Sequence, residues 1–284
     1  MASSAGGSGA AVRSGDTIMS RLETLALIYV LAVLAMCGGW LWQRRRRNAG
    51  IVDVIWSAGL AAGALLSGLA GGGRAEARVL AAVCGGAWGV RLAGHLWRRA
   101  RSEAEDGRYR ALRERWGATQ GRWFALFQFQ AGLVGLFSVP FVIVAWNGTP
   151  RPLCLAAAAA IWCLSVALET LADRQLARFR RDPANRGRTC RLGLWRYSRH
   201  PNYFFEWLHW FTYAVAAIGA AHAWLAWSGP LLMYVFLRYF SGIPFTEAQA
   251  LRTRGDDYRD YQASTPMLFP WPPRRRRAST AART

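Results

Sequence analysis

The stretch SRHPNYFFEWLHW, residues 198–210, places side chains that can bind ligands and move protons at the start of an apolar run. Its polar groups recur at intervals of four, three and four residues, at Asn202, Glu206, His209 and Tyr213. This spacing puts them on one face of a helix. In a membrane helix, a polar stripe must face protein or a water-filled cavity. The stripe therefore predicts a buried ligand site; the alternative is a Glu–His pair that only joins helices.

The residues before the stripe predict an anion site. Pro201 suits the first position of a helix, so His200 is expected to precede that helix with free N–H groups nearby. Such a helix start beside Arg196 and Arg199 is suited to a phosphate. The positive field extends upstream through Arg178, Arg180, Arg181, Arg186, Arg188 and Arg191. Arginines are also common in ordinary cytoplasmic loops, and this remains the alternative for each of them.

The elements that position these residues are apolar runs. The chain has 284 residues, 53% of them hydrophobic, with 15 tryptophans and a net charge of +20. Nucleic-acid binders do not normally interleave basic runs with long apolar ones, so we exclude nucleic acid and expect membrane lipids as partners. About seven runs approach the length that crosses 30 Å of hydrocarbon. They are roughly 22–42, 51–71, 78–98, 123–146, 152–172, 203–219 and 222–242.

The sequence therefore predicts an all-α fold, a polytopic bundle of about seven transmembrane helices. We expect one membrane domain over residues 22–272. A disordered tail is expected at 1–21, and a basic disordered tail at 273–284. Arginine-rich connections alternate with nearly neutral ones, so every basic connection falls on one side. The positive-inside bias predicts that this side is cytoplasmic, with the N-terminus outside and the C-terminus inside. The chain is expected in the cell membrane, as a multi-pass protein.

Other ionisable groups inside the runs crowd the same cytoplasmic half. Such groups are costly in hydrocarbon and suggest a function or a partner. They are Asp53, Arg91, His95, Glu169 and Arg238. The 5 cysteines and 4 histidines show no ligand spacing, so no metal site is predicted. Two segments in the connections, 105–117 and 250–262, have a helical rhythm with arginines between aromatic residues. They predict surface helices that anchor at the membrane, or alternatively line a site for an anionic ligand.

The motifs of this sequence resemble those of a known family. LGLWRYSRHPNYFFEW resembles the signature "GLW-RY-SRHPNY-GE" of the DUF1295 family, a bacterial membrane family related to the C-terminal domain of steroid 5α-reductases. The likeness continues in order over roughly residues 25–273. It includes IVDVIWSAGL, WGVRLAGHLWRR, EDGRYRALRERWG, DRQLARFRRDPANRGR and SGIPFTEAQALRTRGDDYRDYQASTPMLFPWPP. RHPNY alone is less specific, because isoprenylcysteine carboxyl methyltransferases share RHPxY and a similar ending.

The resemblance implies a helical bundle that binds NADPH from the cytoplasmic side and reduces a carbon–carbon double bond. The substrate would be a lipid-soluble, steroid- or isoprenoid-like molecule. Carried onto matching positions, the implied cofactor contacts are Arg178, Arg188, Trp195, Tyr197, Arg199, His200, Asn202, Tyr203, Glu206 and Glu247. One position departs from the pattern: the family usually has glycine after PNYF, and Phe205 stands there. A side chain at this position could fill space that the cofactor would occupy.

Hydride transfer to an enone also needs a proton donor near the carbonyl oxygen. Asp53, Glu206 and His95 are the candidate catalytic residues. Two other functions stay open. One is a methyltransferase of the isoprenylcysteine type that uses S-adenosylmethionine, and the other is a non-catalytic lipid-binding protein. The sequence leaves the substrate and the oligomeric state open.

Overall fold

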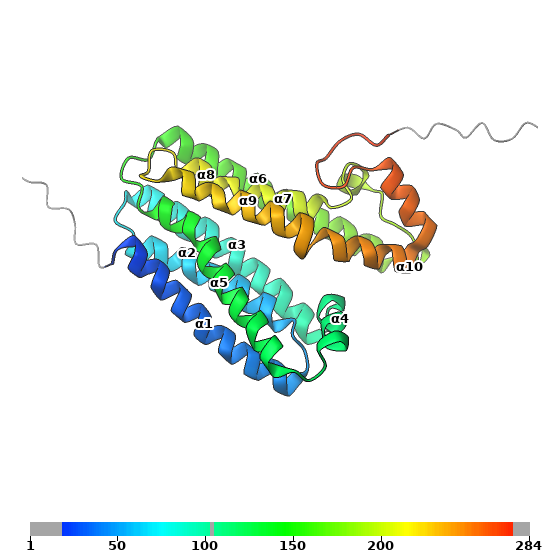
Figure 1. Ribbon diagram of the computed structural model, residues 1–284. Coiled ribbons are helices and arrows are strands. Elements are labelled where there is room, and N and C mark those ends of the chain that lie inside the picture. The colour runs from blue at the N-terminus through cyan, green and yellow to red at the C-terminus, as the bar shows by residue number, and fades with distance from the viewer. Residues whose placement is uncertain (1–18, 103–104, 275–284) are drawn as a thin grey trace, which may run out of the picture.

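The computed structural model describes residues 19–102 and 105–274, and the described residues form helices and connections without any strand. The predicted all-α fold is thus confirmed for them (Figure 1). The α-helices are α1 Arg21–Arg46, α2 Ile51–Ala70, α3 Ala75–Ser102, α4 Gly107–Trp116, α5 Gln120–Ala145, α6 Pro152–Arg181, α7 Pro201–His209, α8 Phe211–Ala216, α9 Ser228–Val235 and α10 Ile243–Ser264. The expected tails at 1–21 and 273–284 lie mostly outside the described residues.

Among the described residues, 5 helices are long and apolar enough to cross a membrane: α1, α2, α3, α5 and α6. The predicted runs 203–219 and 222–242 are instead built from short pieces. The first divides at Trp210 into α7 and α8, and the second joins a 3-10 helix at Ala223–Trp227, α9 and a π-helix at Phe236–Phe240. The count of seven therefore stays a prediction, although these pieces run along α6 in Figure 1.

Successive long helices run in opposite directions, so the connections gather at two ends of the bundle. The connection after α1, helix α4, the connection after α6 and α10 lie at one end (Figure 1). These are the arginine-rich segments. The predicted segregation of charge is thus a feature of the fold, whereas the side of the membrane on which this end lies stays a prediction.

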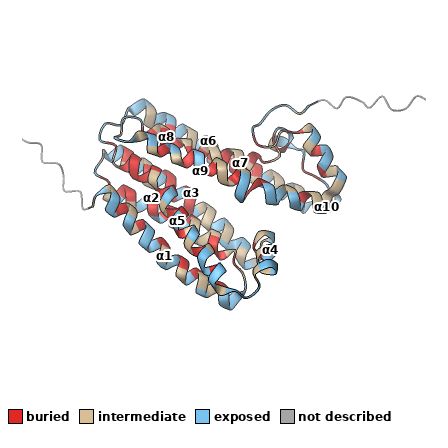
Figure 2. Ribbon diagram, in the orientation of Figure 1, coloured by how far each residue is buried: buried red, intermediate tan, exposed pale blue. Residues whose placement is uncertain are grey.

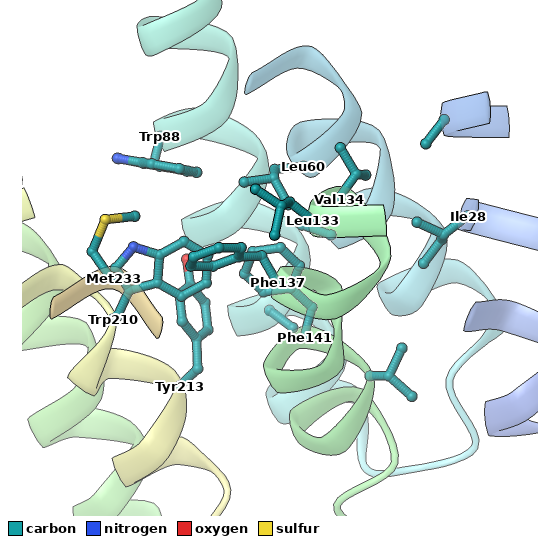
Figure 3. Close-up of a cluster of buried hydrophobic side chains, with 14 of the residues drawn as sticks. Ile28, Leu60, Trp88, Leu133, Val134, Phe137, Phe141, Trp210, Tyr213 and Met233 are labelled. Atoms are coloured by element: carbon teal, nitrogen blue, oxygen red, sulfur yellow. The ribbon is translucent and has the colours of Figure 1, made fainter. Parts of the chain in front are cut away.

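Two groups of helices meet in an aromatic core. Helices α1, α2, α3 and α5 form one group, and α6 to α10 form the other (Figure 1). Trp88 of α3, Phe137 of α5 and the bulky residues at the α7–α8 break pack together between them (Figure 3). The Trp210 ring centroid lies 5.0 Å from that of Phe137 and 5.5 Å from that of Trp88. Buried positions accordingly concentrate where the two groups face each other (Figure 2).

Small residues bring α2 and α3 into close contact. A Cβ atom added at Gly85 would lie 2.5 Å from Cβ of Ala64, and one at Gly89 would lie 2.9 Å from the Ala61 backbone nitrogen. Close helix approach through glycine and alanine is typical of membrane bundles. This contact fixes where α3 presents its polar side chains to the second group of helices.

Gly89→Leu is expected to lower the free energy of unfolding by about 1–3 kcal/mol, because the new side chain must push α2 away. Gly94→Leu on the same helix is the matched control, since a Cβ there meets nothing within 4 Å. Thermal unfolding of both variants in detergent checks the difference. Equal stability of the two variants would contradict the close contact.

Candidate functional site

Three helices each contribute one polar stripe to a common cluster in the interior. Each stripe follows helical spacing of three or four residues, so its members share a face. We define the inner polar cluster as Trp88 and Arg91 of α3, Glu169 and Asp173 of α6, and Asn202, Glu206 and His209 of α7. The cluster begins at the arginine-rich end, because α7 starts there with Pro201 as its first residue after His200, as predicted.

The three stripes are joined by direct polar contacts. Arg91 Nη2 lies 2.6 Å from Glu169 Oε1, which pairs α3 with α6. Trp88 Nε1 donates a hydrogen bond of 3.0 Å to Glu206 Oε2, which links α3 to α7. Asn202 Nδ2 donates over 3.1 Å to Asp173 Oδ1, which links α7 to α6. The polar groups therefore hold the mutual position of three helices.

His209 forms the deep end of the cluster. Its ring is fully buried and stacks on Trp88 with the ring centroids 4.7 Å apart. Its Nε2 lies 2.9 Å from the hydroxyl oxygen of Tyr213. The predicted stripe thus runs past the break at Trp210: α7 ends at His209, but Tyr213 on α8 still faces it.

Several buried polar atoms of the cluster have no hydrogen-bond partner among the described residues. Three are acceptors on acid or amide groups: Glu169 Oε2, Asn202 Oδ1 and Glu206 Oε1. The others are Arg91 Nε, which can donate, and His209 Nδ1. Buried polar groups are nearly always satisfied, so unpaired atoms grouped in one place call for a polar ligand or ordered water. The arrangement can accept several N–H groups and donate at least one hydrogen bond.

The cluster is also unbalanced in charge. Glu169, Asp173 and Glu206 all lie within electrostatic reach of Arg91, which is the cation among the seven residues of the cluster. His95 follows Arg91 by one turn and interacts with Asp173, but its side chain is exposed at the edge of the cluster. The predicted catalytic pair Glu206 and His95 is therefore brought to one region, with different degrees of burial.

The motif residues Arg199 and His200 belong to a second polar cluster, around Glu247. Arg199 Nε lies 2.7 Å from Glu247 Oε1, and His200 Nε2 lies 3.2 Å from the same oxygen. Gln262 Nε2 donates over 2.9 Å to Glu247 Oε2. Arg199 Nη1 also donates to the carbonyl oxygens of Gln262 and Thr265. We call these contacts the Glu247 lock; through them, the predicted cofactor residues Arg199, His200 and Glu247 bind one another.

A kink in α10 makes the lock possible. Glu247 and Gln262 are 15 residues apart and would be separated by roughly 22 Å on a straight helix. Gly255 interrupts the helix with φ 49° and ψ −121°, a conformation that favours glycine. The chain folds back after it, as the end of α10 shows in Figure 1. The last part of α10 thereby closes over the motif that precedes α7.

The lock predicts an acid-sensitive stability. Burial raises the pKa of Glu247, but hydrogen bonds from His200 and Arg199 outweigh it and hold the pKa at about 2. A folded-state pKa below the unfolded value contributes stability that is present above about pH 4.5 and is lost as the pH falls toward 2. The melting temperature of the wild type is expected to fall more steeply over this window than that of Glu247→Gln. Parallel pH profiles for the two proteins would contradict the prediction.

The remaining predicted cofactor residues are spread over the same end. Trp195 is buried and donates from Nε1 to the carbonyl oxygen of Ala172 over 2.9 Å. Tyr203 stacks on His200, with its hydroxyl oxygen 3.1 Å from Thr246 Oγ1. Tyr197, Arg178 and Arg188 are exposed. Of all the predicted cofactor residues, only Asn202 and Glu206 lie in the inner polar cluster.

Asp53 belongs to a different contact network. Arg108 Nη2 lies 3.0 Å from Asp53 Oδ2, and the Tyr109 hydroxyl donates over 2.7 Å to Asp53 Oδ1. Burial and the neighbouring Asp53 carboxylate raise the pKa of Tyr109, which keeps it a donor. Asp53 thus fastens α4 across the start of α2. The structure does not bring it into contact with Glu206.

Sequence reasoning left out part of the cluster. Arg91 and Glu169 were noted only as ionisable groups inside the apolar runs and were not assigned to the site, and Trp88 and Asp173 were not noted. A signal was present: Glu169 and Asp173 are four residues apart, as are Arg91 and His95, so each pair shares a helix face. Trp88 gave no such signal, because its role depends on contact with a residue 118 positions away.

The model of the DUF1295 family, described as a protein of unknown function, matches residues 39–265. This range contains every residue of the inner polar cluster and of the Glu247 lock. No curated protein and no solved structure matches the chain.

Proposed function

We propose that this chain, which belongs to the DUF1295 family, is a membrane-embedded NADPH-dependent reductase. It reduces a carbon–carbon double bond in a lipid-soluble, steroid- or isoprenoid-like substrate. We place the arginine-rich end in the cytoplasm, the N-terminus outside and the chain in the cell membrane. The observation that carries this proposal is the group of unpaired buried polar atoms in the inner polar cluster.

These atoms suit the carboxamide of a nicotinamide. A carboxamide presents two N–H donors and one carbonyl acceptor. Glu206 Oε1 and Asn202 Oδ1 are free to accept, and Arg91 Nε is free to donate. Closer to the end of the bundle, Arg178, Arg180 and Arg188 are exposed and make no ion pair with the described residues. Such arginines, beside a helix start, suit the phosphates of a dinucleotide.

Residues of the chain would bind the cofactor, orient the substrate and protonate it. NADPH supplies the hydride when bound. Glu206 is held by Trp88 through one oxygen, so its other oxygen can face a ligand. His95 is the proton donor we favour, because the free oxygen of Glu206 would accept from the carboxamide. Asp53 is a weaker candidate, because Arg108 and Tyr109 occupy both of its oxygens.

Titration calorimetry of NADPH into the detergent-purified protein tests the proposal. Asn202→Ala and Glu206→Gln are each expected to weaken NADPH binding roughly tenfold or more. Alanine removes the acceptor of Asn202, and glutamine leaves a single acceptor oxygen for both Trp88 Nε1 and the ligand. Glu114→Gln is the matched control, since Glu114 is exposed on α4. The control is expected to bind as the wild type does.

The same experiment separates the alternatives. S-adenosylmethionine binding that depends on Glu206, without NADPH binding, would replace the reductase with the methyltransferase. If neither NADPH nor S-adenosylmethionine binds, the non-catalytic, lipid-binding function becomes the favoured one. Phe205 is the residue that favours this last outcome, because its buried side chain stands where the resembled signature has glycine.

A further inference from the structure

A group of exposed arginines lies at one corner of the bundle, away from the inner polar cluster. The corner is formed where α1 ends, α4 crosses and α5 begins (Figure 1). We call it the arginine corner. Its members are Arg44, Arg45, Arg46, Arg47, Arg110, Arg115 and Arg122.

Contacts between the three elements hold the corner together. Gln43 of α1 donates from Nε2 to Gln120 Oε1 of α5 over 3.1 Å. Trp116 of α4 packs edge-on against Trp123 of α5, with ring centroids 5.2 Å apart. The Ala49 backbone N–H, just after α1, donates over 2.7 Å to Glu105 Oε1, just before α4. The arginines therefore belong to one folded surface.

Helix α4 divides its arginines between two faces. On the inner face, Arg108 pairs with Asp53 and Asp106, and Arg113 pairs with Glu105. On the outer face, Arg110 and Arg115 are exposed and form no ion pair with the described residues. Glu114 is the exposed acid of this helix. The fold thus neutralises the inner charges and leaves the outer ones in excess.

The corner lies at the depth of lipid headgroups. Exposed apolar side chains cover α1 from Leu22 to Leu41, a rise of roughly 28 Å, which matches the hydrocarbon thickness. The arginines follow directly. Arg44 stacks over Trp40 at 4.9 Å from the ring centroid, and Trp40 packs on the half-exposed Phe124. Aromatic rings and arginines at this position are typical of the membrane–water interface.

We propose that the arginine corner binds the headgroups of anionic phospholipids. Seven exposed arginines face one exposed acid, Glu114, so the surface complements a negatively charged headgroup layer. Binding there concentrates anionic lipids around α1, α4 and α5. The proposal is independent of the reductase function, because the corner shares no residue with the inner polar cluster.

Native mass spectrometry of the full chain tests the proposal. The protein is equilibrated in micelles with equal amounts of phosphatidylglycerol and phosphatidylcholine that carry the same acyl chains. The wild type is expected to retain phosphatidylglycerol in several-fold excess, and added salt is expected to reduce that excess. Replacing Arg45, Arg46, Arg110 and Arg115 together with glutamine is expected to reduce that excess by about half or more, because four of the seven arginines of the corner are lost.

Two controls isolate the effect. Lysine at the same four positions keeps the charge and is expected to keep the excess of phosphatidylglycerol. Arg74→Gln with Arg151→Gln changes exposed arginines at the opposite end of the bundle and is expected to leave the ratio unchanged. The proposal would be overturned by an unchanged ratio in the glutamine variant or by no excess in the wild type. It would also be overturned if the lysine variant lost as much of the excess as the glutamine variant.

Discussion

Arg91→Met is expected to lower the free energy of unfolding by roughly 3–5 kcal/mol, the cost of leaving a buried charge without its partner. Glu169 is 6% exposed and lies 2.6 Å from Arg91. Methionine keeps the unbranched, apolar first part of the side chain but is shorter and removes the charge. Unfolding in mixed micelles, followed by the circular dichroism of the helices, measures the loss.

The double variant Arg91→Met with Glu169→Leu is expected to recover most of this stability, because both charges are then replaced by apolar groups. Arg101→Met is the matched control on the same helix. Arg101 is exposed and stacks on Trp97, so its replacement is expected to change stability by about 0.5 kcal/mol or less. If Arg91→Met and Arg101→Met were equally stable, the ion pair would not be what holds Glu169 in the interior.

The long helices could be predicted from the sequence because a hydrocarbon layer imposes a single length on them. An apolar run of about 20 residues has no other way to satisfy its backbone there. This reasoning identified α1, α2, α3, α5 and α6. It could not locate the breaks after α7 and α9, because a helical and an interrupted segment have the same composition. Packing of Trp210 between Phe137 and Trp88 accompanies the first of these breaks.

The residues of the candidate site on α7 could be predicted from the sequence, but those on α3 and α6 could not be assigned to the site. Asn202, Glu206 and His209 are neighbours along one helix face, so their spacing alone places them together. The side chains that meet them come from segments about 30 and about 120 residues away. Packing between helices decides which face of α3 or α6 turns toward α7. A local sequence pattern does not reveal that packing.

The same limit applies to the motif before α7. Arg196 and Arg199 were interpreted as part of a phosphate site because arginines near a helix start suit an anion. The resemblance added His200 to the implied cofactor contacts. The fold supplies that anion from within the chain, since Glu247 returns on α10 and accepts from Arg199 and His200. The positive charge of Arg199 is therefore used to fasten α10. Phosphates would instead be bound by the exposed Arg178, Arg180 and Arg188.

Phe205→Gly is expected to act on stability and on cofactor binding in opposite directions. The Phe205 side chain is 6% exposed and packs edge-on against Phe204, with ring centroids 5.1 Å apart. Its removal is expected to lower the free energy of unfolding by roughly 3–5 kcal/mol. Glycine within α7 adds about 1 kcal/mol to this loss. If the ring occupies cofactor volume, the same change is expected to strengthen NADPH binding several-fold in calorimetry.

The prediction is decisive because stability is expected to fall while the affinity for NADPH rises. General damage to the fold would lower both. Phe204→Ala is the matched control: Phe204 is a half-buried neighbour that packs on Phe269 as well as on Phe205. It is expected to lower stability without strengthening NADPH binding. If Phe205→Gly lost stability and bound NADPH no better than the wild type, Phe205 would be an ordinary core residue. The glycine of the resembled signature would then be unnecessary for a site built from Asn202, Glu206 and Arg91.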